Sequence, residues 1–218
     1  MVPLAALLSG CSVNYSNVAL LPDGRPQLTV MAPKMEQNIR ELAGALLALG
    51  PGVRREEAIE VAHDAYAYPL YLANEWDLTW PPMYHNTLRN SGARKKGLCT
   101  DWAKAMVDHM RQKNLQSMDV YWGVAYKGDP WREHSTLLVT AKGQPFDTGI
   151  ILDPWRNSGK LYWVKHLDDP SYKWKYHAGP VWPLATAGTT GQKDSADRLK
   201  QAAPTNKNPG RRPYFMLN

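Results

Sequence analysis

The stretch Gly97-Leu98-Cys99-Thr100-Asp101-Trp102 stands where a polar, proline-containing part of the chain gives way to a helical pattern. Beyond it, large apolar side chains recur at every fourth position: Trp102, Met106 and Met110. This spacing predicts a helix over about residues 98–113 with one buried face. Cys99 then lies at the helix N-terminus, where unpaired N–H groups and partial positive charge favour a thiolate over a thiol.

After this helix the apolar pattern changes from helical to extended. The segments rich in strand-forming residues are 120–126, 134–141, 147–153 and 161–163. Lys142-Gly143-Gln144-Pro145 predicts a turn between the second and third of them. We therefore expect an antiparallel meander in which His134 opens one strand and Asp153 closes the next, so that the two side chains meet.

Before the cysteine, the sequence predicts two further helices. In the first, apolar residues from Met35 to Leu49 follow helical spacing until Gly50-Pro51-Gly52 stops the run. The second starts near Arg54, and Pro69 is expected to kink or end it. Residues 76–97 read as a long loop. The order predicts an α+β fold: N-terminal helices followed by an antiparallel β-sheet packed on the helix that bears Cys99.

The two ends of the chain differ from its centre. Residues 1–10 are largely apolar, and Leu8-Ser9-Gly10-Cys11 resembles the lipobox of bacterial lipoproteins. The resemblance implies cleavage before Cys11, lipidation of its thiol and attachment to a membrane of the bacterial cell envelope, facing the periplasm or exterior. The alternative is a buried N-terminal helix with an ordinary cysteine. Residues 11–33 are predicted to be a tether, 34–187 the folded domain, and 188–218 a basic, flexible tail.

Composition excludes several classes of protein. With 218 residues, 44% hydrophobic and 21% charged, the chain fits one globular domain. Two cysteines cannot form a disulfide framework. The net charge of +6 is concentrated after residue 190, which argues against a nucleic-acid-binding face.

Metal and nucleotide sites are also disfavoured. The remaining histidines show no metal-ligand spacing: His63, His85, His109, His166 and His177. Asp168-Asp169 lacks the acidic spacing of a calcium loop, and there is no glycine-rich phosphate loop. We therefore expect no metal and no cofactor.

The sequence does contain the three residue types needed for nucleophilic catalysis by a thiol. A thiolate at Cys99 would attack, a base at His134 would move the proton, and a carboxylate at Asp153 would orient the base. Each residue also has an ordinary structural interpretation: a small buried cysteine, a core histidine and an aspartate in a turn. Their order along the predicted elements favours a Cys-His-Asp triad.

The same residues resemble the transglutaminase-like (papain-like) superfamily of cysteine proteases and transamidases. The matching features are Gly97-x-Cys99-x-x-Trp102, His134 at a strand start, and Asp153-Pro154 after the next strand. The resemblance covers roughly residues 80–165. Many relatives have an aromatic residue where this chain has Thr136, and the polar stretch after Asp153 is longer than usual.

The resemblance implies an enzyme that cleaves or transfers an amide bond of a protein or peptide through an acyl-enzyme. For the oxyanion we expect the Cys99 N–H and, before it, the side chain of Asn86, which could equally cap a turn. Asp101 and Glu133 are interpreted as solvated neighbours, and Trp131 and Trp155 as walls of a cleft. The alternative function is a non-catalytic envelope lipoprotein that uses the same fold to bind a partner.

Overall fold

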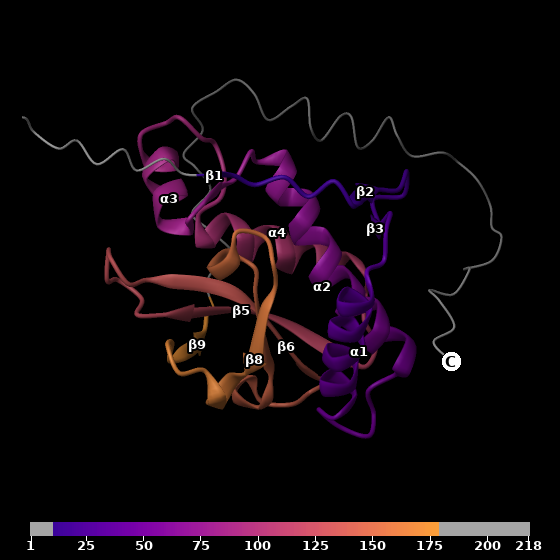
Figure 1. Ribbon diagram of the computed structural model, residues 1–218. Helices are drawn as coiled ribbons and strands as arrows, with labels where there is room; N and C mark the ends of the chain where they lie inside the picture. The colour runs from indigo at the N-terminus through magenta and orange to yellow at the C-terminus, as the bar shows by residue number, and fades with distance from the viewer. Residues whose placement is uncertain (1–10, 179–218) are drawn as a thin grey trace, which may run out of the picture. The chain divides into compact units, whose positions relative to one another are not determined.

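The computed structural model describes residues 11–178, which form an α+β domain (Figure 1). These residues contain four α-helices and a five-stranded antiparallel sheet. In Figure 1 the helices lie along the top and right of the domain, and the strands of the five-stranded sheet lie at the lower left. The predicted signal segment, the end of the predicted domain beyond residue 178 and the predicted basic tail lie outside the described residues.

The sheet follows the predicted meander and adds one strand. Its order is β8-β7-β6-β5-β9, and every neighbouring pair is antiparallel. The bounds are β5 Met118–Ala125, β6 His134–Ala141, β7 Ile150–Asp153, β8 Tyr162–Lys165 and β9 Trp174–Tyr176. Sequence patterning missed β9 because it has only three residues. It pairs with the end of β5 and closes the edge of the sheet beside His134, whose Cα partner is Ala125.

Three helices occupy the predicted places: α1 Pro33–Leu47, α2 Arg55–Glu75 and α4 Cys99–Gln112. The expectation that Pro69 would end the second helix was wrong, because α2 continues through Pro69 to Glu75. Pro69 is buried within α2, so tertiary packing of the helix compensates for the loss of the backbone hydrogen bond that proline cannot make.

The segment predicted as a long loop, residues 76–97, contains regular structure. It holds β4 Thr79–Trp80 and the helix α3 Pro82–Asn90. Pro82 suits the first turn of a helix, where its missing N–H would have no partner anyway. The only side chain of α3 that is buried is His85, so the helix buries no apolar side chain that could mark it in the sequence.

The segment predicted as a tether, residues 11–33, is packed on the domain instead. It forms β1 Cys11–Ser12, which pairs with β4, and a hairpin of β2 Val18–Leu20 with β3 Pro26–Leu28. Tyr15 is held to α2 by two backbone hydrogen bonds with the Asn74 side chain, of 2.8 and 2.7 Å. Its hydroxyl donates to the Ser158 carbonyl oxygen at 3.1 Å.

A buried carboxylate fixes α4 against α2. Asp64 of α2 has no exposed surface, and its Oδ2 atom lies 2.8 Å from Nε2 of His109. Lys113 forms ion pairs with both Asp64 and Glu60. Burial raises the pKa of Asp64, but its hydrogen bonds with His109 and His63 and the charge of Lys113 outweigh that effect and hold the pKa well below its usual range. The helix that carries Cys99 is thereby tied down at its far end.

We predict that Asn74→Ala releases the N-terminal segment. Two backbone groups of Tyr15 would lose their partners, which should lower the free energy of unfolding by about 1–3 kcal/mol. Urea unfolding followed by tryptophan fluorescence measures this loss. Asn90→Ala, at an exposed position, is the matched control and should change stability by less than about 0.5 kcal/mol. Equal effects of the two substitutions would mean that residues 11–17 contribute nothing to stability.

Candidate functional site

Cys99, the first residue of α4, is partly exposed. The helix start is held by Asp101, whose Oδ2 atom accepts hydrogen bonds from the N–H groups of Gly97 and Leu98 at 3.1 and 3.2 Å. The expectation that Asp101 is a solvated neighbour was therefore wrong: its carboxylate caps the helix that presents the thiol. An acidic residue in the first helical turn was the signal for this role.

Behind Cys99, a buried histidine packs against a glycine. His85 is 1% exposed; its Nδ1 accepts a hydrogen bond from the Thr79 N–H at 3.1 Å, and its Nε2 lies 2.8 Å from the Lys96 carbonyl oxygen. These two partners require the proton on Nε2. Gly97 has φ +115°, and a Cβ there would lie 2.3 Å from His85 Nε2. Only glycine satisfies both conditions at this position.

His134 and Asp153 are brought together as the strand prediction required. Both are buried, at the start of β6 and the end of β7, and the His134 Nε2 atom lies 2.7 Å from the Asp153 Oδ2 atom. Burial lowers the pKa of His134, but the Asp153 carboxylate and the neighbouring Cys99 thiol outweigh it and raise the pKa to about 9. The imidazole is therefore held in its charged form at neutral pH.

Cys99 lies beside the same imidazole. Its Sγ atom is 3.9 Å from the carbonyl oxygen of Glu133, the residue before His134. Because Asp153 occupies Nε2, the ring nitrogen that remains for the thiol is Nδ1. The Asp153 carboxylate and the Cys99 side chain thus both interact with the His134 imidazole. Glu133 is exposed, as expected, and its Oε2 atom accepts a hydrogen bond from the Gly128 N–H at 2.6 Å.

Three aromatic rings surround the imidazole. The ring centroids of Trp155, Tyr172 and Trp174 lie 4.7, 4.6 and 5.4 Å from that of His134. These rings exclude water from His134 and Asp153, which strengthens the interaction between them. Trp131 differs from Trp155, because it is 88% exposed in the connection between β5 and β6.

Asn86 reaches the site from α3. Its Oδ1 atom accepts a hydrogen bond from the Trp155 indole N–H at 3.3 Å. This contact uses the acceptor atom of the amide and leaves the Nδ2 donor available. A role for Asn86 toward an oxyanion stays a prediction.

Sequence reasoning missed two charged residues beside Asp153. Arg156 donates from Nε to Asp153 Oδ2 at 2.7 Å and also pairs with Asp169, which is 2% exposed. Arg156 follows Asp153 by three residues, and this acid-to-base spacing was the one available signal. Asp169 lies in a segment that sequence analysis considered only as a calcium loop, and nothing in its local sequence indicated burial.

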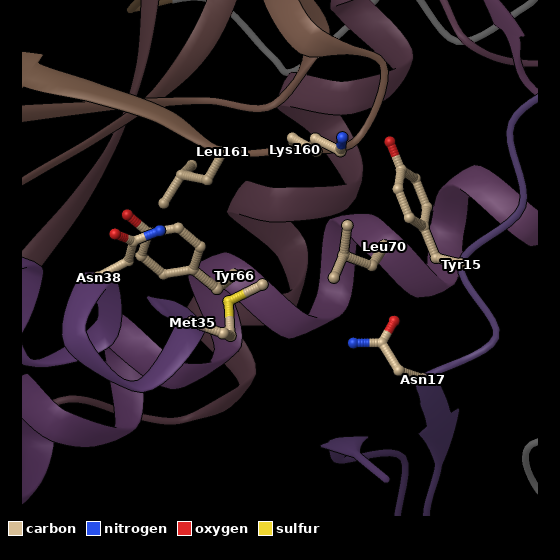
Figure 2. A pocket seen from close by; sticks show the side chains of 8 residues that line it. All are labelled: Tyr15, Asn17, Met35, Asn38, Tyr66, Leu70, Lys160 and Leu161. Atoms are coloured by element: carbon tan, nitrogen blue, oxygen red, sulfur yellow. The ribbon is translucent and has the colours of Figure 1, made fainter. Parts of the chain in front are cut away.

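A separate pocket of about 280 Å³ lies between α1, α2 and the N-terminal segment (Figure 2). Figure 2 shows the Lys160 amine and the Tyr15 hydroxyl at one end of it, and Tyr66 with Asn38 at the other. The pocket is lined by Tyr15, Asn17, Met35, Asn38, Tyr66, Leu70, Lys160 and Leu161. None of the three triad candidates lines it, so it is distinct from the site around Cys99.

Neither a metal centre nor a membrane span is found among the described residues. No group of three His, Cys, Asp or Glu side chains there is arranged to hold a metal ion. Between residues 11 and 178, no helix has the length and apolar character needed to cross a membrane. Cys11 is exposed on β1, where its Cα partner is Trp80.

Comparison of the chain with protein-family models, with curated proteins and with solved structures found no match.

We predict that Gly97→Ala disturbs the start of α4 because the added Cβ would overlap His85. The combined backbone and packing cost should be about 2–4 kcal/mol in the free energy of unfolding, measured in urea. Gly92→Ala is the matched control: its φ is +83°, but a Cβ there would meet nothing within 4 Å, so only about 1 kcal/mol is expected. Equal losses in the two variants would show that His85 does not constrain Gly97.

Proposed function

We propose that the protein is a thiol enzyme with a transglutaminase-like core, which cleaves or transfers an amide bond of a protein or peptide. The observation that carries this proposal is a buried His134–Asp153 pair beside a partly exposed cysteine at a helix N-terminus. A cysteine with only a packing role needs neither a charged imidazole beside it nor a carboxylate behind that imidazole.

The proposed reaction begins with the Cys99 thiolate. Its sulfur attacks the amide carbonyl carbon, and the carbonyl electron pair moves onto oxygen, facing the Cys99 N–H and the Asn86 amide. When the intermediate collapses, the C–N bond breaks and His134 gives its proton to the leaving amine. A thioester to Cys99 remains.

The second half of the reaction regenerates the thiolate. Water or an amine attacks the thioester carbon, and His134 accepts the proton of that nucleophile. The C–S bond breaks, which releases a carboxylic acid after hydrolysis or a new amide after transfer. Asp153 keeps the imidazole oriented throughout and stabilises its charged form. No cofactor takes part in this sequence.

We further propose that Cys11 carries a lipid anchor in a bacterial cell envelope, with the domain facing the periplasm or exterior. The β1–β4 pairing supports this, because it puts Cys11 next to Trp80. Trp80 and Met83 are 49% and 58% exposed, and an exposed tryptophan beside an acyl chain suits the interface of a bilayer. An anchor at Cys11 would hold this edge of the domain against the membrane.

The proposed nucleophile is tested by alkylation. Iodoacetamide should label Cys99 at pH 6–7 faster than it labels glutathione at the same pH, because the helix N-terminus and the charged imidazole favour the thiolate. Intact-mass spectrometry of the full chain with Cys11→Ala measures the rate. His134→Ala should slow labelling about tenfold or more, whereas Asp153→Asn should slow it less but impair turnover strongly.

Turnover is measured with casein as a general protein substrate. New amino groups report hydrolysis, incorporation of a fluorescent primary amine reports transfer, and Cys99→Ala is the blank. If Cys99 reacts only above pH 8.5 or only after denaturation, it is a structural thiol. The non-catalytic binding protein would then replace the enzyme as the better interpretation.

The proposed anchor is tested in a bacterial host. With an intact export signal, the wild-type chain should fractionate with membranes, and Cys11→Ala should become soluble or remain uncleaved, because the thiol that would carry the lipid is gone. Ser12→Ala, next to it in β1, is the control and should remain in the membrane fraction. A Cys11→Ala protein that is still cleaved and membrane-bound would contradict lipidation.

A further inference from the structure

The Asp153 carboxylate has a second cationic partner besides His134. One oxygen, Oδ2, accepts hydrogen bonds from His134 Nε2 and from Arg156 Nε, both at 2.7 Å. The other, Oδ1, accepts from the Trp155 N–H at 3.2 Å. Imidazole and guanidinium therefore share a single oxygen atom, and three contacts limit rotation of the carboxylate.

Arg156 is fixed in turn by Asp169. Its Nη2 atom donates to Asp169 Oδ2, and its Nη1 atom lies 3.4 Å from Asp169 Oδ1. Asp169 also accepts hydrogen bonds from the Ser171 N–H at 2.9 Å and the Trp174 indole N–H at 2.8 Å. Both carboxylates that hold Arg156 are thus almost completely buried.

Two aromatic rings lie against the guanidinium as well. Its central carbon lies 4.2 Å from the ring centroid of Tyr162 and 4.7 Å from that of Tyr172. Tyr172 is the same ring that packs on His134. An arginine held by two carboxylates and two rings has a fixed geometry, which lysine could not reproduce.

We propose that Arg156 and Asp169 form a positioning pair that orients the Asp153 carboxylate and sets how much of its negative charge acts on His134. The inference rests on the proposed function, since it concerns the orienting residue of the proposed triad. Neither residue reaches the reacting atoms; both act through Asp153.

The charges around His134 give the two members opposite effects. The imidazole faces Cys99, Asp153 and the Tyr172 ring, with Glu133 preceding it in the chain and Arg156 and Asp169 behind Asp153. The positive charge of Arg156 partly neutralises Asp153, so Asp153 stabilises the protonated imidazole less. The negative charge of Asp169 partly neutralises Arg156, so Asp153 again stabilises the protonated imidazole more strongly.

The experiment is a pH titration of His134 by NMR of its ring carbon and proton in the full chain, assigned with His134→Gln. Arg156→Met should move the titration midpoint to higher pH, because Asp153 is then uncompensated. Asp169→Asn should move it to lower pH, because Arg156 then acts on Asp153 alone. We expect shifts of about one pH unit each, a tenfold change in the protonation equilibrium.

Two further variants separate the effect from general damage. The double variant Arg156→Met/Asp169→Asn should return the midpoint toward the wild-type value. Arg40→Met, which breaks an exposed ion pair with Glu36 on α1, should leave it unchanged. If Arg156→Met fails to fold, Asp169→Asn and Arg156→Lys test the proposal instead. Asp169→Asn should lower the titration midpoint of His134. Arg156→Lys should nearly preserve that midpoint, while kcat falls about tenfold and KM stays nearly unchanged.

Midpoints that move in the same direction, or not at all, would overturn the positioning pair. This outcome is separate from the fate of the enzyme proposal. Opposite shifts in a protein whose Cys99 is unreactive would leave the pair standing and remove the enzyme. A reactive Cys99 without opposite shifts would leave the enzyme proposal standing and remove the positioning pair.

Discussion

Burial of the Asp153 carboxylate is the constraint on which the arrangement of the site depends. An ionised carboxylate without water must be surrounded by donors and positive charge, or folding becomes unfavourable by several kcal/mol. Here the donors come from His134 at the start of β6, from the Trp155 backbone and from Arg156 in the turn after β7. Each partner is thereby fixed relative to the sheet. The charged imidazole is a direct consequence, because Asp153 favours the protonated ring.

The thiol reaches this pair from an independently stabilised element. Asp101 caps the start of α4, Gly97 allows the close approach of His85, and Asp64 ties the far end of the helix to α2. Cys99 and His134 thus belong to two separately stabilised elements that meet at the Glu133 carbonyl group. A site assembled from rigid elements keeps its geometry without a bound ligand, which is what nucleophilic catalysis requires.

The N-terminal segment connects the proposed anchor to this site. It crosses α2 through Asn74 and reaches the turn after β7 through the hydrogen bond from Tyr15 to Ser158. Ser158 follows Arg156 by two residues, so the segment also contacts the turn that carries Arg156. A lipid on Cys11 would therefore hold the domain closely and not at the end of a flexible tether. Substrates near the membrane surface would then be favoured over distant ones.

The sequence by itself determined the order of α1, α2 and α4 and of strands β5 to β8, and the places of Cys99, His134 and Asp153. These follow from local signals: apolar periodicity, a glycine just before a helix start, and short turns between neighbouring strands. Adjacent antiparallel strands then leave little freedom in where His134 and Asp153 can meet. Tertiary structure alone decided that α2 passes through Pro69, that residues 11–33 pack on the domain, and that Arg156 and Asp169 join the site. These features depend on contacts between residues that are distant in sequence. The free energy of such contacts exceeds the local secondary-structure preferences, and the residues that make them show no periodic pattern in the sequence.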